Sequence, residues 1–140
     1  PTPPAGLAIL RDLRTSPKKL TVAAQLVNGR HIRDALVLAQ SVPNKALGFV
    51  FRALKLARGE AVMNKGYRED DLVVQRVTVG KGTHLKRLLI HGRGRAGRMH
   101  KHRAHLRLHV GPGEARPTVQ VLLPWLIRSR LKREAQQHAL

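Results

Sequence analysis

The chain has 140 residues, of which 42% are apolar and 3% aromatic, and it carries a formal net charge of +19 at pH 7. This length suits about one domain with a modest core, and the scarcity of aromatic rings argues against the stacking platforms of single-strand-binding proteins. The absence of cysteine excludes disulfides and thiolate metal sites, and the longest apolar stretch, residues 119–127, is too short to cross a bilayer.

The first element predicted along the chain is a short strand at residues 7–13, where apolar side chains alternate with small or charged ones. Its content of Ala and Leu would also suit a helix. A helix is then predicted to begin at Ser16-Pro17, because serine caps helix N-termini and proline is favoured in the first turn. Apolar residues follow at helical spacing, and Asn28-Gly29 predicts the end of this helix.

Two further helices are predicted in the first half of the chain. One covers about residues 31–41 and ends before Pro43, because proline disfavours helical backbone in the residue that precedes it. Asn44 is placed to cap the other helix, whose apolar stripe continues to Ala61.

The hydrophobic period changes to two at residues 72–79 and again at 104–110, which predicts two strands. In the first strand, the odd-numbered residues are predicted to face one way and the even-numbered residues the other way. In the second strand, Leu106, Leu108 and Val110 share one face. Antiparallel pairing of the two strands makes residues 80–103 a long hairpin, which would reach on the order of 30 Å beyond the sheet at roughly 3.3 Å per residue.

These elements predict an α+β fold, in which three helices pack on a small antiparallel sheet that carries a long protruding β-hairpin. Residues 1–113 are expected to form this domain, and residues 114–140 a basic C-terminal extension. Within the extension, a helix is expected at 125–137, where a narrow apolar stripe is surrounded by Arg and Lys.

The basic charge is concentrated in the predicted hairpin. Residues 72–113 contain ten Lys or Arg and no Asp or Glu, so this segment cannot neutralise itself by internal ion pairs. A charge run is commonly a solvated face, but that interpretation leaves a projecting hairpin without counter-charges unexplained. A partner rich in phosphate explains both the projection of the hairpin and the missing counter-charges, because basic side chains neutralise phosphate with release of counterions. Arginine near the tip and the irregular crevices of folded RNA favour RNA over duplex DNA as the partner.

Three other chemistries have less support in the sequence. Residues 92–97 match the Gly-x-Gly-x-x-Gly dinucleotide fingerprint, but a strand rather than a helix is predicted after them. Six of the eight histidines cluster at 84–109, yet no cysteine or carboxylate is available to complete a metal shell. Ser16 is better explained as a helix cap than as a nucleophile, and the carboxylates at 69–71 lie in a predicted turn. We therefore predict no enzymatic activity, cofactor, metal site or small-molecule substrate.

Several motifs occur in the same order and with similar spacing in one known protein family. They are Arg14-Thr15-Ser16-Pro17-Lys18-Lys19-Leu20, Gly29 followed by Asp34-Ala35-Leu36, Leu85-Lys86-Arg87, Gly94-Arg95-Ala96 with Arg98 and Lys101, and His105. Over about residues 7–110, the chain resembles the large-subunit ribosomal proteins of the L-twenty-two family, of bacterial and organellar type.

The resemblance implies a structural constituent of the large ribosomal subunit that binds large-subunit rRNA, assists assembly and lines the nascent-peptide exit tunnel with its hairpin tip. Its implied partners are the rRNA, neighbouring ribosomal proteins near the tunnel exit, and the nascent polypeptide. The implied rRNA-binding residues are Lys18, Lys19, Lys81, Lys86, Arg87, Arg93, Arg95, Arg98, Lys101 and Arg103. The implied tunnel tip consists of Ile90, His91, Gly92, Arg93, Gly94, Arg95 and Ala96.

The cellular location is suggested by the two ends of the chain. The numbering begins at Pro1 rather than Met, so we expect an upstream segment that would carry any targeting peptide. Together with the basic C-terminal extension, this favours a ribosome of the mitochondrial matrix, with the plastid or the bacterial cytoplasm as alternatives. The alternative function is a non-ribosomal basic module, either an RNA chaperone or a protein that binds anionic surfaces through residues 125–137.

Overall fold

The computed structural model describes residues 4–114 of the chain. Its elements are β1 (Gly6–Leu13), α1 (Pro17–Val27), α2 (Ile32–Ser41), α3 (Lys45–Gly59), a π-helical turn (Glu60–Asn64), a 3-10 turn (Glu69–Asp71), β2 (Leu72–Lys81), β3 (Leu85–Ile90), β4 (Ala96–Lys101) and β5 (Ala104–Pro112). The predicted α+β fold, with three helices and antiparallel sheets, is thereby confirmed. The helix expected at 125–137 lies outside the described residues.

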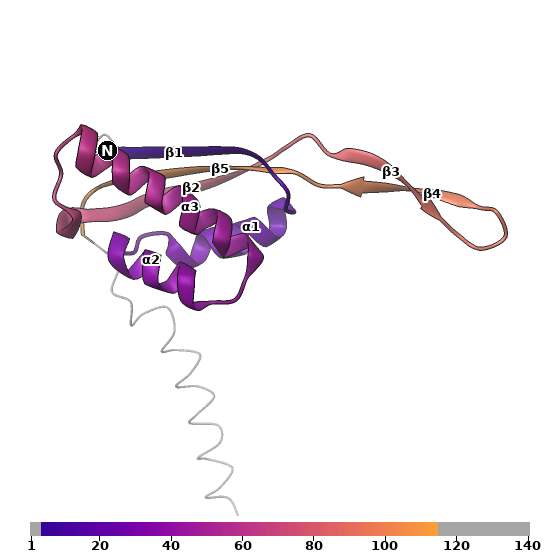
Figure 1. Ribbon diagram of the computed structural model, residues 1–140, viewed down its shortest axis with the longest axis horizontal. Coiled ribbons are helices and arrows are strands. Elements are labelled where there is room, and N and C mark those ends of the chain that lie inside the picture. The colour runs from indigo at the N-terminus through magenta and orange to yellow at the C-terminus, as the bar shows by residue number, and fades with distance from the viewer. Residues whose placement is uncertain (1–3, 115–140) are drawn as a thin grey trace, which may run out of the picture.

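The strands form two sheets, and the helices lie on one side of the larger one (Figure 1). The larger sheet has the order β1-β5-β2, and both of its pairs are antiparallel. Strand β1 confirms the strand predicted at residues 7–13, because only an extended chain can pair with β5 along this length. The smaller sheet is the hairpin of β3 and β4, which projects far beyond the helices.

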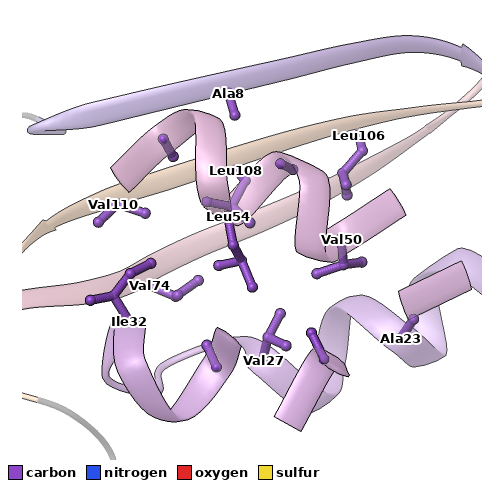
Figure 2. Packing of buried hydrophobic residues seen from close by; sticks show 14 of the residues in the cluster. Ala8, Ala23, Val27, Ile32, Val50, Leu54, Val74, Leu106, Leu108 and Val110 are labelled. Carbon is purple, nitrogen blue, oxygen red and sulfur yellow. The ribbon is translucent and has the colours of Figure 1, made fainter. Parts of the chain in front are cut away.

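One hydrophobic core fills the space between the larger sheet and the helices. Leu106, Leu108 and Val110 of the central strand are fully buried, as predicted, and face Leu54 of α3 and its neighbours (Figure 2). The stripes predicted on the three helices also point into this core. The buried helical residues are Leu20, Ala23, Ala24 and Val27 on α1, Ile32, Ala35 and Ala39 on α2, and Ala46, Leu47, Val50, Ala53, Leu54 and Ala57 on α3.

The helix ends follow the predicted signals with one exception. Helix α1 begins at Pro17 and ends before Gly29, which has the left-handed φ of 78° that favours glycine. Asn44 caps α3, because its side-chain oxygen accepts a hydrogen bond from the backbone N–H of Ala46 at 2.9 Å. Ser16 occupies the corresponding position before α1, but its side chain forms no capping hydrogen bond. The predicted cap by Ser16 is therefore wrong in its contact, although the helix begins where it was expected.

We expect replacement of Asn44 with alanine to lower the free energy of unfolding by about 1 kcal/mol, because it removes a capping hydrogen bond. Ser16→Ala is the matched control and should change stability by much less, since no capping bond is lost. Urea unfolding followed by circular dichroism measures both values. Equal losses in the two variants would contradict the assignment of the cap to Asn44 alone.

Strand β2 departs from the predicted alternation. A β-bulge shifts its register against β5 between Val74 and Arg76, so the inward residues are Leu72 and Val74 before the bulge and Val77 after it. The extra residue is Gln75, whose side-chain amide donates a hydrogen bond to the carbonyl oxygen of Pro112 at 3.3 Å. The prediction of one uninterrupted alternation over 72–79 is therefore wrong, because a bulge moves the following side chains to the opposite faces.

Strand β1 approaches helix α3 closely at Gly6. A Cβ atom added to Gly6 would collide with the backbone carbonyl of Ala57 on α3. Just beyond this contact, the Glu60 carboxylate accepts a hydrogen bond of 2.7 Å from the backbone N–H of Leu7. Because Glu60 begins the π-helical turn, the end of α3 holds the start of the edge strand.

Candidate nucleic-acid interface

The candidate interface is the hairpin formed by β3 and β4, which the sequence placed at residues 80–103. Its register runs without interruption from the pair Leu85 and Lys101 to the pair Ile90 and Ala96. All six residues of β3 are exposed, although apolar side chains such as Leu88 are among them. The hairpin therefore has no packed face of its own within the described part of the chain.

Basic side chains occupy both faces of the hairpin. Residues directly opposite each other in an antiparallel pair share a face, and the faces alternate along each strand. Arg87 and Lys101 therefore lie on one face, whereas Lys86 and Arg98 lie on the other. A single flat anionic surface could neutralise only one of these faces. The arrangement instead suits a polyanion that surrounds the hairpin.

The tip is a tight turn that presents Arg93 at its apex. The backbone N–H of His91 donates to the carbonyl oxygen of Arg95 at 2.8 Å, which closes the loop beyond the paired strands. Arg93 and Gly94 both have positive φ values, 59° and 70°, as a two-residue hairpin turn of type I′ requires. A left-handed conformation costs a non-glycine residue roughly 1 kcal/mol. The turn therefore adopts this conformation despite its free-energy cost and presents an exposed arginine at the tip of the hairpin.

The base of the hairpin is fastened to strand β1. Arg103 donates a hydrogen bond to the backbone oxygen of Asp12 at 3.3 Å and lies 3.5 Å from the carboxylate of the same residue. Asp12 has a φ of 54°, and its N–H donates to Nδ1 of His105 at 3.0 Å. Across the hairpin, the N–H of Gly82 donates to the carbonyl oxygen of Arg103 at 2.9 Å. These contacts hold the direction in which the hairpin leaves the sheet.

Comparison with known proteins identifies the family. The model of the family described as Ribosomal protein L22p/L17e matches residues 8–111, which include most of the larger sheet, the three helices and the whole hairpin. The chain belongs to this family.

Bacterial relatives agree with the family match over most of the chain. The large ribosomal subunit protein uL22 of Herpetosiphon aurantiacus is 38% identical over 107 residues, which are 76% of this chain and 95% of the relative. The protein of the same name from Rhodopseudomonas palustris is 41% identical over 108 residues, which are 77% of this chain and 84% of the relative. Membership of a family of ribosomal proteins confirms the predicted resemblance, and it confirms the prediction that the chain is not an enzyme.

The structure places the residues that the resemblance implied for this family in three locations. The arms and tip of the hairpin carry Lys86, Arg87, Arg93, Arg95, Arg98 and Lys101, and all six side chains are exposed. Lys81 and Arg103 lie at the base, where the Arg103 side chain is only 17% exposed because it packs against Asp12. Lys18 and Lys19 are exposed in the first turn of α1. Arg103 thus holds the hairpin, whereas the other nine are accessible to a partner.

A cleft lies between the start of the first helix and the base of the hairpin. It has a volume of about 410 Å³ and is lined by Lys19 of α1, by His102 at the hairpin base, and by Arg14 and Lys45. The last two were missed by the sequence analysis. The sequence did contain a signal for these two residues. Helices favour negative charge in their first turn, yet neither α1 nor α3 has an acidic residue there.

The glycines and histidines of the hairpin have structural explanations. The Gly-x-Gly-x-x-Gly segment runs into strand β4, which begins at Ala96, so it lacks the helix that a dinucleotide site requires. Gly97 leaves room for the His91 ring, since an added Cβ atom would lie 2.6 Å from Nε2. The rings of His84 and His100 meet edge to face at 4.5 Å between centroids. Within residues 4–114, no three His, Cys, Asp or Glu side chains are placed to hold a metal ion, and no helix there is long and apolar enough to cross a bilayer.

Proposed function

We propose that this protein, a structural constituent of the large ribosomal subunit, has its hairpin held within folded large-subunit rRNA. The observation that carries the proposal is the presence of exposed basic residues on both faces and at the apex of a projecting hairpin without a carboxylate. Folded RNA supplies phosphate on all sides of such an element. Membership of a ribosomal protein family supports the same conclusion.

The hairpin tip, residues 90–96, would line the nascent-peptide exit tunnel, and the globular part would contact neighbouring ribosomal proteins near the tunnel exit. The support for this placement is the resemblance together with the length of the hairpin, which carries the tip far from the core (Figure 1). Contact with the nascent polypeptide and assistance in early assembly belong to the same proposal. Crosslinking from a photoreactive residue at position 93 to a stalled nascent chain tests the tip, and crosslinks to rRNA alone would contradict it.

We also propose a division of the chain into a domain at residues 1–113 and an extension at 114–140. Support comes from β5, which ends the sheet at Pro112 after its last core residue, Val110. A chain truncated after residue 113 should unfold cooperatively with unchanged free energy. A large loss of stability in the truncated chain would show that the extension belongs to the domain.

Within the cell, the protein is proposed to reside in the ribosome of the mitochondrial matrix, with the plastid or the bacterial cytoplasm as alternatives. The basic extension beyond the family match supports an organelle, whereas the relatives compared are bacterial. Sedimentation of tagged protein from purified mitochondria and plastids distinguishes these locations, because the protein should follow the large subunit in only one of them.

Direct binding tests the proposed function. The full chain should bind a transcript of large-subunit rRNA with an affinity that falls steeply as salt rises, because binding to phosphates releases counterions. Competition with unrelated RNA of equal length and with anionic lipid vesicles is the control. Equal affinity for all three would favour a non-ribosomal module that binds any polyanion.

A further inference from the structure

The face of the larger sheet that points away from the helices carries two arginines. Two rows cross it, one formed by Leu7, His109 and Arg76 and the other by Ile9, Arg107 and Thr78. We call these six residues the open face. Arg76 and Arg107 are exposed, and no residue of either row is acidic. The open face is therefore a second basic surface, separate from the hairpin.

The bulge in β2 is what brings Arg76 to this face. Without the bulge, Arg76 would share a face with Leu72 and Val74, both of which are fully buried in the core. With the extra residue inserted, Arg76 pairs with His109 and points outward. The bulge thus places an arginine on the open face, although the packing of the core does not require a charge there.

The two arginines are diagonal neighbours on adjacent strands, because Arg76 pairs with His109 and Arg107 lies two residues before it. Diagonal neighbours are separated by about 7–8 Å. Within residues 4–114, neither guanidinium forms an ion pair or a side-chain hydrogen bond. Both line a depression of about 750 Å³ together with Thr78, His109, Gln75 and Glu114. Glu114 is the one carboxylate in this lining, and it pairs with neither arginine.

We propose that the open face is a second rRNA-binding surface, on which Arg76 and Arg107 bind phosphates of one backbone segment lying in the depression. The proposal rests on the proposed function. Guanidinium groups bind phosphate through two parallel hydrogen bonds, which favours nucleic acid as the ligand. Strands β2 and β5 also run from the open face towards the base of the hairpin, so RNA around the hairpin is close to this surface (Figure 1).

The double variant Arg76→Gln, Arg107→Gln in the full chain tests the proposal. At 150 mM salt, its affinity for a large-subunit rRNA transcript should fall about tenfold, and the slope of log K against log salt should become shallower by roughly 1.5. Unchanged circular dichroism and thermal unfolding would show that the fold is intact, which is expected because both side chains are exposed.

The matched control is Arg52→Gln, Lys55→Gln, which removes the same charge from the exposed side of α3. An equal loss of affinity in the control would show that the lower net charge of the protein, and not the open face, causes the effect. That result would overturn the proposal. The proposal would also fail if the open-face variant bound normally while a hairpin variant did not, although the proposed function would then stand. Normal RNA binding with failed incorporation into the subunit would overturn it in favour of a protein partner. Failure of the unaltered chain to bind rRNA would instead refute the proposed function.

Discussion

Replacement of Leu108 with alanine is expected to lower the free energy of unfolding by about 3 kcal/mol, because it leaves a cavity in the centre of the core. Leu108 lies on the central strand, is fully buried, and pairs with Ala8 on one side and Val77 on the other. Since its neighbour Ala8 is small, the Ala8 side chain can fill little of the space that Leu108 leaves. Urea unfolding of the full chain, at a salt concentration that screens self-repulsion, measures the loss.

Leu88→Ala on the hairpin is the matched control for this variant. The Leu88 side chain is 71% exposed, so its truncation should change the free energy of unfolding by less than about 0.5 kcal/mol. The same chemical change would then have very different effects in the core and in the hairpin. Similar losses at both positions would show that the hairpin packs against the globular part of the isolated protein.

The helical half of the fold could be predicted because its signals are local. Pro17, Gly29 and Asn44 act through their own backbone preferences or through hydrogen bonds to residues two or three positions away. The same holds for the period of two in β5, which reports directly on its buried face. A local signal of this kind does not depend on how the rest of the chain is arranged.

The departures come from contacts between distant segments. The bulge in β2 is supported by a hydrogen bond from Gln75 to Pro112, and the close approach of β1 to α3 depends on Gly6 and Ala57. In the sequence, Gln75 fits an alternating pattern and Gly6 resembles an ordinary loop residue. Neither position could be interpreted correctly before its partner in the fold was known.

The candidate interface shows the same division. Basic residues without acidic neighbours were sufficient to single out the hairpin as the segment that we propose to bind phosphate. They could not predict that Arg103 would be held by Asp12, which is 91 residues away in the sequence, or that Arg76 would be turned outward. Charge composition therefore marked the hairpin as the candidate interface, whereas the distinction between a side chain that supports the hairpin and one that is accessible to a partner required the structure.

The triple variant Arg93→Gln, Arg95→Gln, Arg98→Gln is expected to weaken binding to large-subunit rRNA by about 100-fold at physiological salt, at roughly 1 kcal/mol for each lost contact. All three side chains are exposed, and none belongs to the core. The slope of log K against log salt should become shallower by about 2 to 3, because each phosphate contact contributes about 0.7 to 0.9. Filter binding over a salt series measures both quantities.

The same variant should unfold with unchanged cooperativity and free energy, because the sheet and the helices lose no contact. Arg93→Gly separates the side chain from the backbone conformation at the apex, since glycine adopts the φ of 59° without strain while the arginine side chain and its charge are lost. Its affinity should therefore lie between those of the unaltered chain and the triple variant. Loss of cooperative unfolding in the triple variant would mean that the hairpin charges stabilise the domain itself. An rRNA affinity of the triple variant equal to that of the unaltered chain would mean that the rRNA is bound elsewhere on the protein.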